Sequence, residues 1–325
     1  MRKFRTYHDV DKSTGSQLLD QVLDQRSRLA ERLAGIGQVV AVASGKGGVG
    51  KSAVTANLAV TLSAMGRRVG VVDADLNGPS LDRMLGVPRG VLVDRADGVV
   101  PPKGAAGVPV ISMELLQEAE DAPLRWQDPG GDTFIWQSTM ETNALREFLA
   151  DVAWGELDYL LVDIPPGTDK IGRFLELVPA LPVALLVTTP SELSRAVVAR
   201  SLRMVREAGI PSVALVANMS GYRCPGCGER HPIFPGDGAR RLSEEGSVPI
   251  WGEIPFDPRI SEDTDRGRPR VLEDPEGEVA QGFRQVALHL EEAAGEGKVS
   301  GAGKVSGAGQ VSGPGKASPH EGSQP

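Results

Sequence analysis

The stretch Gly45-Lys46-Gly47-Gly48-Val49-Gly50-Lys51-Ser52 decides the fold of this chain. It satisfies the pattern G-x-x-x-x-G-K-[S/T], directly follows the apolar run Val39–Ala43, and precedes an expected helix over Ala53–Met65. In such a strand–loop–helix unit, glycines let backbone N–H groups converge on phosphate oxygens, and the helix N-terminus adds positive potential. The sequence therefore predicts a phosphate-binding loop. An unliganded glycine-rich turn is the weaker alternative, because every fixed position of the pattern is present.

The residues of this loop have distinct expected roles. Lys51 is expected to neutralise the charge of the β- and γ-phosphates of a nucleotide, and the hydroxyl of Ser52 is expected to bind Mg²⁺. The residues expected to contact the nucleotide directly are Gly45, Lys46, Gly47, Gly48, Val49, Gly50, Lys51, Ser52 and Ala53.

Outward from the loop, short apolar runs rich in β-branched residues alternate with helical stretches. The runs are Val39–Ala43, Arg68–Val72, Tyr159–Asp163, Val183–Thr188 and Ser212–Ala217. Nearly continuous apolar strands separated by helices are typical of a parallel sheet covered on both faces. The expected fold class is thus α/β, with a doubly wound, mostly parallel sheet. The Gly-, Pro- and Asp-rich segment 86–131 is expected to be mostly irregular, with one strand at Val108–Met113.

Three aspartates stand at the C-terminal ends of expected strands. Asp73 and Asp75 end the second run, and Asp163 ends the very apolar third run. Ligands of open α/β sheets bind at this edge, so these carboxylates are expected beside the phosphate loop. Asp163 has the place of a carboxylate that contacts Mg²⁺ through water, and the other two can orient water and the magnesium shell. Any one of them alone could instead cap a helix.

The two cysteines, Cys224 and Cys227, form a C-x-x-C turn with Pro225 and Gly226 after the last of these runs. Such a turn can direct two thiolates at one metal, but two ligands complete neither a tetrahedral nor a cubane site. A twofold axis through the pair would supply four thiolates for one 4Fe–4S cluster. His231 keeps a zinc site open as an alternative, and a thioredoxin-like redox pair is a third.

Composition restricts the partners and the compartment. The 325 residues carry a formal net charge of −8 without a long basic run, so nucleic acid is not an expected partner. The sequence contains no run of about 18 apolar residues, which argues against insertion into a membrane. Two closely spaced cysteines make a poor disulfide framework, which fits a reducing compartment, and the expected localisation is cytoplasmic.

Three segments are expected along the chain. Residues 1–37 form a helical extension, in which Ser13–Leu33 has the periodicity of an amphipathic helix. Residues 38–294 form the phosphate-loop domain, whose metal loop spans residues 219–231. Residues 295–325 are rich in Gly, Ser and Lys, have almost nothing to bury, and are expected to be disordered.

Lys46 is additional to the basic phosphate-loop pattern. With it the sequence resembles the deviant Walker A ATPases of the SIMIBI class, which includes MinD, ParA and the nitrogenase iron protein. In that class this lysine reaches the phosphates of the other subunit, so the resemblance implies an ATP-dependent homodimer. It also implies that Lys46, Lys51 and Asp75 carry catalysis, with Asp75 positioning the water and Asp73 supporting it.

From about Gln38 to Val271 the chain resembles, more specifically, the Mrp/ApbC iron–sulfur carrier ATPases. The stretches that carry this resemblance are SGKGGVGKS (Ser44–Ser52), DADLNGPS (Asp73–Ser80), WGELDYLLVDIPPGT (Trp154–Thr168), NMS with CPGCG (Asn218–Gly228) and IPFDPRI (Ile254–Ile260). The resemblance implies that ATP hydrolysis with Mg²⁺ is coupled to holding a 4Fe–4S cluster on Cys224 and Cys227 of a homodimer. It further implies transfer of the cluster to apoproteins and a contribution of Asn218 to adenine recognition.

Three departures from the family pattern bear on these expectations. Asp169-Lys170 stand where the family usually reads Gly-Asp, Asn77 replaces a common tyrosine, and Trp136-Gln137-Ser138-Thr139 replaces a usual W-R-G-P. We expect the first to change switch behaviour and hydrolysis rate, and the others to suit a specialised paralogue. Two further interpretations stay open at this point: a MinD- or ParA-like positioning ATPase, and a nucleotide-gated adaptor with a structural zinc.

Overall fold

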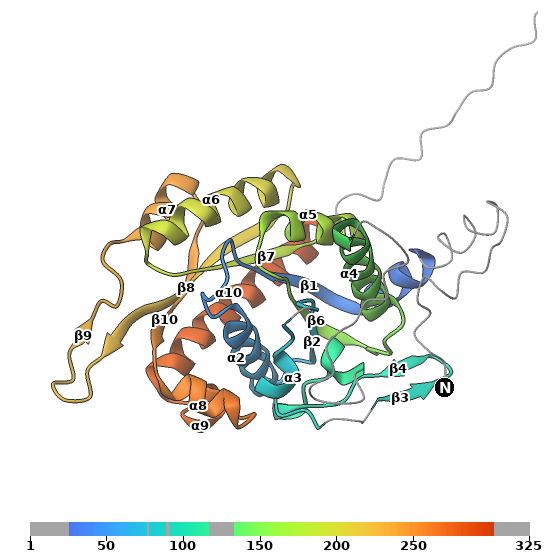
Figure 1. Ribbon diagram of the computed structural model, residues 1–325, viewed down its shortest axis with the longest axis horizontal. Coiled ribbons are helices and arrows are strands. Elements are labelled where there is room, and N and C mark those ends of the chain that lie inside the picture. Colours follow the sequence, from blue (N-terminus) through green and yellow to red (C-terminus); the bar gives the residue numbers. More distant parts are fainter. Residues whose placement is uncertain (1–25, 77, 89–91, 117–132, 302–325) are drawn as a thin grey trace, which may run out of the picture.

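A computed structural model of the chain describes residues 26–76, 78–88, 92–116 and 133–301 (Figure 1). Its main sheet has the strand order β10-β8-β7-β1-β6-β2-β5. These strands are parallel to their neighbours, and only the short β9 is antiparallel, to β8. The strands are β1 (Ile36–Ala43), β2 (Val69–Asp73), β5 (Val110–Ile111), β6 (Leu157–Asp163), β7 (Val183–Thr188), β8 (Ser212–Arg223), β9 (Arg230–His231) and β10 (Ile250–Phe256). The expected doubly wound, mostly parallel α/β fold is confirmed.

Helices cover both faces of this sheet (Figure 1). One face carries α2 and α10, which contact each other, and the other carries α5, α6 and α7. The helices are α2 (Lys51–Ala64), α3 (Leu81–Met84), α4 (Thr133–Ala150), α5 (Thr168–Leu177), α6 (Glu192–Glu207), α7 (Gly238–Gly246), α8 (Arg259–Asp265), α9 (Arg270–Glu273) and α10 (Glu278–Gly301). Two 3₁₀ turns, η2 (Ala105–Gly107) and η3 (Met113–Leu116), lie near β5.

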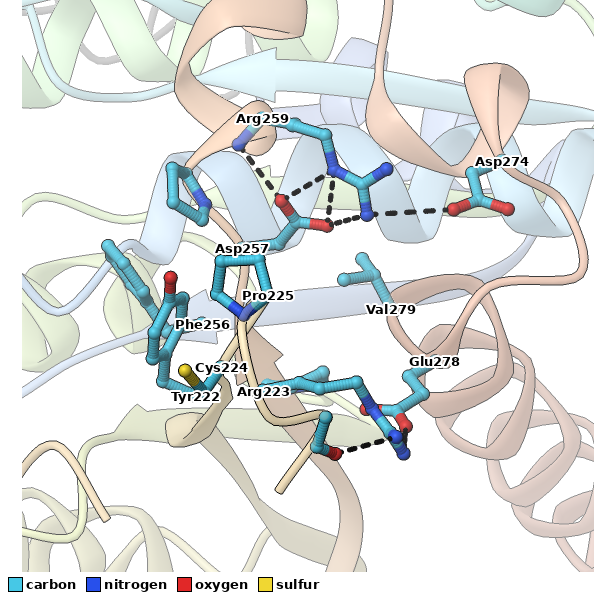
Figure 2. A pocket seen from close by; sticks show the side chains of 13 residues that line it. Tyr222, Arg223, Cys224, Pro225, Phe256, Asp257, Arg259, Asp274, Glu278 and Val279 are labelled. Carbon is cyan, nitrogen blue, oxygen red and sulfur yellow. Dashed lines mark hydrogen bonds and ion pairs between the residues drawn. The ribbon is translucent and has the colours of Figure 1, made fainter. Parts of the chain in front are cut away.

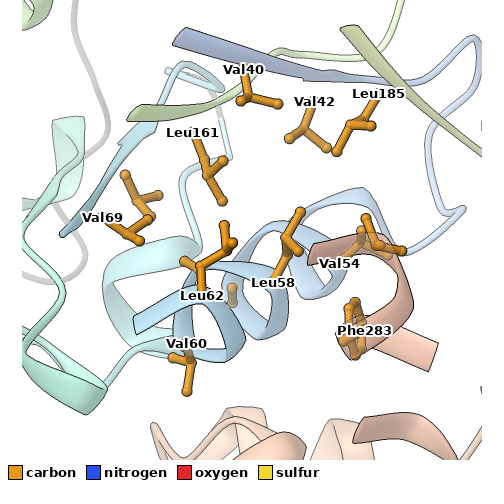
Figure 3. Close-up of a cluster of buried hydrophobic side chains, with 14 of the residues drawn as sticks. Val40, Val42, Val54, Leu58, Val60, Leu62, Val69, Leu161, Leu185 and Phe283 are labelled. Carbon is orange, nitrogen blue, oxygen red and sulfur yellow. The ribbon is translucent and has the colours of Figure 1, made fainter. Parts of the chain in front are cut away.

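The alternation of side chains along β1 divides the core into two layers. Val40 and Val42 belong to the layer under α2 and α10, whereas Val39 and Ala41 belong to the opposite layer. Figure 3 shows the first layer, in which Leu58 of α2 faces the sheet. Because β1 is buried on both faces, it reads in the sequence as a continuous apolar run. The phosphate loop thus follows a strand whose last five residues, Val39–Ala43, are all buried.

The region 86–131 has more regular structure than expected. β3 (Val93–Arg95) and β4 (Gly98–Val100) form an antiparallel hairpin, which the Gly- and Asp-rich composition concealed. The strand expected at Val108–Met113 is present in a shorter form as β5, and residues 117–132 lie outside the described part of the chain.

The two ends differ in part from expectation. Residues 26–34 are helical and overlap the end of the leader helix expected over Ser13–Leu33, and Leu29 is buried in the layer opposite α2. The rest of that helix lies outside the described residues. α10 runs to Gly301, past residue 295, where the disordered tail was expected to begin, and Ala293 and Ala294 just before that point still pack against the core. Among the described residues no helix combines the length and apolar character needed to cross a bilayer.

Candidate functional site

The phosphate loop connects the C-terminal end of β1 to α2, and two of its glycines are needed for close contacts. A Cβ on Gly45 would lie 2.8 Å from the backbone of Val197 on α6. Gly50 has φ +79°, and a Cβ there would collide with Nδ2 of Asn218. That same amide donates a hydrogen bond of 2.9 Å to the carbonyl oxygen of Val49. The loop is therefore held from outside by α6 and β8.

Three side chains of α2 converge on Asp163, the last residue of β6. Lys51 Nζ lies 2.6 Å from Asp163 Oδ2, and Ser52 Oγ donates to the same oxygen at 2.7 Å. Thr55 Oγ1 donates to Oδ1 at 2.7 Å. Asp163 is fully buried, so this ammonium and these two hydroxyls compensate a charge that the interior would otherwise disfavour. Thr55 was not among the residues expected at the site, although it lies one helical turn after Lys51 and shares a helix face with it.

The donors at this point fit magnesium. Mg²⁺ prefers hard oxygen ligands and usually binds one or two protein oxygens together with phosphates and water. The Ser52 hydroxyl and the Asp163 carboxylate are such donors, and they lie side by side. Their role in binding the ion stays a prediction.

Asp73 lies at the end of β2, beside Asp163 in the sheet register. Its Oδ2 accepts hydrogen bonds from the backbone N–H groups of Ser80 and Leu81, at 2.8 and 3.0 Å, and its Oδ1 accepts one from Asp75 N–H at 3.1 Å. Burial, followed by the nearby charge of Asp163, raises the pKa of Asp73 to about 7. The carboxylate therefore anchors the loop that follows β2, and its expected role toward magnesium stays a prediction.

The other two residues expected to act in catalysis are more accessible. Asp75 is half-buried within the loop that Asp73 anchors, and its Oδ1 accepts from Gly78 N–H at 3.3 Å. Lys46 is exposed, and its carbonyl oxygen accepts a hydrogen bond from the Ser44 hydroxyl at 3.0 Å. An exposed lysine at the tip of the phosphate loop is available to groups outside its own chain.

Asn218 contacts the phosphate loop, and its expected contribution to adenine recognition stays a prediction. Its side chain is 7 % exposed and is committed through Nδ2 to Val49, so it fixes the phosphate loop. The next residue, Met219, has φ +55°, a left-handed conformation that a side-chain-bearing residue rarely adopts. β8 is therefore irregular directly after its contact with the loop, where its register with β10 shifts.

Lys170, the unusual residue after β6, has an ion-pair partner in α4. Its Nζ bonds Oε2 of Glu141, and the two side chains are 25 % and 13 % exposed. Asp169 lies in the first turn of α5, after Gly167, whose φ of +124° marks the sharp entry into the helix. The departure from the family pattern thus joins α5 to α4, the helix that also holds the altered segment 136–139. Asn77 lies outside the described residues.

The cysteine pair lies in a hairpin at the far end of β8. Tyr222 pairs with His231 and Arg223 pairs with Arg230, which leaves residues 224–229 as the turn. Cys224 N–H donates to the carbonyl of Glu229 at 2.9 Å, and Gly228 N–H donates to the carbonyl of Cys224 at 2.8 Å. The turn is therefore fixed by its own backbone before any metal binds.

The two thiols differ in exposure. Cys224 is half-buried and Cys227 is exposed. The backbone N–H groups of Cys227 and Gly226, with a smaller contribution from the Cys227 thiol, lower the pKa of Cys224. A lowered pKa favours the thiolate, which is the form of cysteine that binds metals.

A cavity of about 580 Å³ opens beside Cys224, between the hairpin, the end of β10 and the start of α10. Figure 2 shows Tyr222, Phe256 and Cys224 on one side of it, and an ion-pair network on the other. In that network Arg259 lies 2.7 Å from Asp257 and 3.8 Å from Asp274. Phe256 is 39 % exposed, so the cavity presents an apolar wall next to one of the thiols.

A sequence model of the NUBPL iron-transfer P-loop NTPases matches residues 35–291 of the chain. The match includes the phosphate loop, the three aspartates and the cysteine hairpin. The chain belongs to this family.

Individual relatives agree with this assignment. An iron–sulfur cluster carrier protein of Saccharolobus solfataricus is 38 % identical over 76 % of this chain and 81 % of its own length. The cytosolic Fe–S cluster assembly factor CFD1 of Saccharomyces cerevisiae is 40 % identical over 72 % of this chain and 78 % of its own. The resemblance to iron–sulfur carriers seen in the sequence is confirmed.

Solved structures resemble this NUBPL-type NTPase in the same way. A nucleotide-binding protein of Archaeoglobus fulgidus, solved with ADP and cobalt, is 36 % identical and covers 79 % of this chain and 96 % of that one, with a TM-score of 0.65. The cell division ATPase MinD of Pyrococcus furiosus is 26 % identical, with coverages of 79 % and 99 % and a TM-score of 0.56. The expected MinD-like fold is therefore confirmed for this member of the family.

Proposed function

We propose that the chain is an ATP-dependent carrier of a 4Fe–4S cluster. It binds ATP with Mg²⁺ at residues 45–53, hydrolyses it, and dimerises with the Lys46 side chains engaging the partner's nucleotide. The cluster is held by Cys224 and Cys227 of both subunits and passes to apoproteins. The names of the relatives support the cargo, and the name of the yeast relative supports a cytoplasmic location.

The observation that carries this proposal is that one strand joins the two sites. β8 contacts the phosphate loop through Asn218 and leads directly to Cys224 at its far end. Six residues separate Asn218 from Cys224, so at a rise of about 3.3 Å per residue the two lie no more than about 20 Å apart. A nucleotide-dependent shift of the loop would therefore move the base of the cysteine hairpin, which gives ATP a physical route to the cluster.

Each phosphate-loop residue has a defined role in this proposal. Backbone N–H groups of residues 47–52 would hold the phosphates, and Lys51 would move from Asp163 to the β- and γ-phosphates. Once Lys51 has moved, the negative charge of Asp163 would attract a magnesium ion bound at Ser52. The positive charge of that ion would also neutralise the phosphates. Asp75, held by the backbone that Asp73 anchors, would orient the attacking water.

Anaerobic reconstitution with iron and sulfide tests the cluster. We expect about one 4Fe–4S cluster for every two chains, read from the charge-transfer absorption and from iron and sulfide analysis. Cys224→Ala and Cys227→Ala should each abolish the absorption, whereas His289→Gln on α10 should not change it. An unchanged spectrum in Cys224→Ala, or zinc in place of iron in protein isolated without oxygen, would reject the assignment.

Phosphate release and solution mass test the nucleotide part. Lys51→Ala should lose ATP binding, and Lys46→Gln should keep it but lose both turnover and the ATP-dependent rise in mass. Lys103→Gln, an exposed lysine near β5, serves as the control. ATP binding without turnover in the wild type would instead support a nucleotide-gated adaptor, the second candidate, which is favoured by the altered Asp169-Lys170 segment.

A further inference from the structure

The turn of the cysteine hairpin gathers more metal-binding side chains than the cluster needs. Cys227 Sγ lies 3.7 Å from His231 Nε2. Glu229 contributes a carboxylate oxygen, and the ligand atoms of Cys227, Glu229 and His231 all lie within 4.8 Å of one another. All three residues are exposed, so the group can be reached from solvent.

The separation of sulfur and nitrogen matches two ligands of a single zinc ion. Zinc–sulfur and zinc–nitrogen bonds of about 2.3 and 2.05 Å, at a tetrahedral angle, place the two atoms about 3.6 Å apart. The Cys227–His231 distance is already at that value, so these two side chains could bind without a rearrangement of the hairpin. A carboxylate is the third kind of ligand that zinc accepts. The thiolate and the carboxylate together also balance the charge of a divalent ion.

The hairpin keeps these three residues in place for local reasons. Glu229 is fixed through its carbonyl, which accepts from Cys224 N–H, and Gly228 adopts φ +76°, which turns the chain between Cys227 and Glu229. Arg223 Nη1 donates to the Gly228 carbonyl at 3.0 Å and buttresses the same turn. His231 lies on β9, opposite Tyr222. One chain therefore holds all three ligands without a partner.

We propose that Cys227, Glu229 and His231 of a single chain form a zinc site that competes with the cluster for Cys227. Zinc would bind with loss of the Cys227 thiol proton to solvent, and a water molecule would complete the tetrahedron. A chain loaded in this way cannot lend Cys227 to a cluster shared with a second subunit. The competition between zinc and the cluster rests on the proposed function, and it would make zinc a regulator of the same hairpin.

Titration of the full-length chain with Zn²⁺ and with Co²⁺, a spectroscopic probe of thiolate ligation, tests the site. We expect one ion per chain, a thiolate-to-cobalt charge-transfer absorption, and no dimerisation on metal binding, read from the mass of the protein in solution. His231→Gln and Glu229→Gln should each weaken zinc binding by at least about tenfold, a loss no smaller than that caused by removing a residue that hydrogen-bonds to a metal ligand. His289→Gln, the matched control on α10, should bind as the wild type does. Bound zinc should also slow cluster reconstitution in the wild type more than in His231→Gln.

If His231→Gln and Glu229→Gln bound zinc as strongly as the wild type, the zinc site would be rejected. A stoichiometry of one zinc ion per two chains would also reject it. The two proposals fail separately. Reconstitution of a full cluster in His231→Gln together with weakened zinc binding supports both. A wild-type chain that binds zinc through His231 but never takes up iron and sulfide keeps the zinc site and rejects the carrier.

Discussion

At the scale of single residues, the contact between Asn218 and the phosphate loop has the clearest energetic consequence. Gly50 and Gly48 both have positive φ, at +79° and +78°, so any other residue at either position is strained. Only Gly50 has a side chain packed against it, namely the Asn218 amide that bonds Val49. The two glycines therefore separate the cost of backbone conformation from the cost of displacing Asn218.

Gly50→Ala should destabilise the nucleotide-free protein more than Gly48→Ala. Both carry the left-handed penalty of roughly 1–2 kcal/mol, and Gly50→Ala adds about 1 kcal/mol for the hydrogen bond of Asn218. Urea unfolding of the two variants and of the wild type measures the difference. Equal losses would show that Asn218 moves aside without cost.

Asp73 makes stability depend on pH. Its pKa is raised from 3.8 to about 7, first by burial and then by the charge of Asp163. Between these two pH values the folded state keeps a proton on Asp73 that the unfolded state has lost. The contribution of this proton is full below about pH 3.8 and is lost as pH rises through about 7. The buried charge then remains, and among the described residues three backbone N–H groups and Lys51 stabilise it.

The free energy of unfolding of the wild type, measured relative to Asp73→Asn, should therefore fall between about pH 5 and about pH 8. Asparagine does not titrate, so subtracting its profile removes the contribution of groups elsewhere. Urea unfolding at the two pH values gives the comparison. A difference that stays constant, or that rises with pH, would contradict the raised pKa.

At the scale of elements, the pair of Lys170 and Glu141 ties α5 to α4. α5 follows directly from β6, whose last residue is Asp163, so its first turn is continuous with the site. Both side chains retain some exposure, and partly exposed ion pairs contribute little to global stability. We therefore expect the ion pair to act locally, by keeping the first turn of α5 ordered.

Glu141→Gln should accelerate hydrogen exchange of the backbone amides at residues 168–172 while lowering global stability by no more than about 1 kcal/mol. Glu176→Gln, an exposed position on α5, is the control. If the hydrogen-exchange rates of these amides were the same in Glu141→Gln and in the wild type, the ion pair would not hold the first turn of α5.

At the scale of the whole molecule, the last helix completes the core that the first strand begins. Phe283 of α10 is 1 % exposed and belongs to the same buried layer as Val54 and Leu58 of α2. Leu288, five positions along the same helix, is 47 % exposed. α2 begins inside the phosphate loop, so the packing of α10 supports the nucleotide site from behind.

Phe283→Ala should lower the free energy of unfolding by about 3–5 kcal/mol, the usual cost of removing a buried phenylalanine. Leu288→Ala should change it by no more than about 0.5 kcal/mol, as expected for an exposed position. Urea unfolding monitored by circular dichroism compares them. Similar losses in the two variants would mean that α10 does not close this core.

The sequence by itself determined the features that local patterns encode. The phosphate loop and its flanking strand and helix follow from Gly45–Ser52, and the parallel sheet follows from apolar runs buried on both faces. The order of the aspartates at strand ends is equally local. Backbone geometry and side-chain periodicity act over a few residues, so they are legible without a structure.

Tertiary structure alone decided which distant residues meet. The bond from Asn218 to Val49, the pair of Lys170 and Glu141, and the closure of the core by α10 join residues far apart in sequence, and no periodicity marks such contacts. The anchoring of the loop by Asp73 likewise depends on how the chain turns back after β2. The sequence already raised His231 as a metal ligand beside the cysteines, and the structure adds its distance of 3.7 Å from Cys227 Sγ. Folding, through burial and close approach, converts residue types that permit a chemistry into a geometry that can perform it.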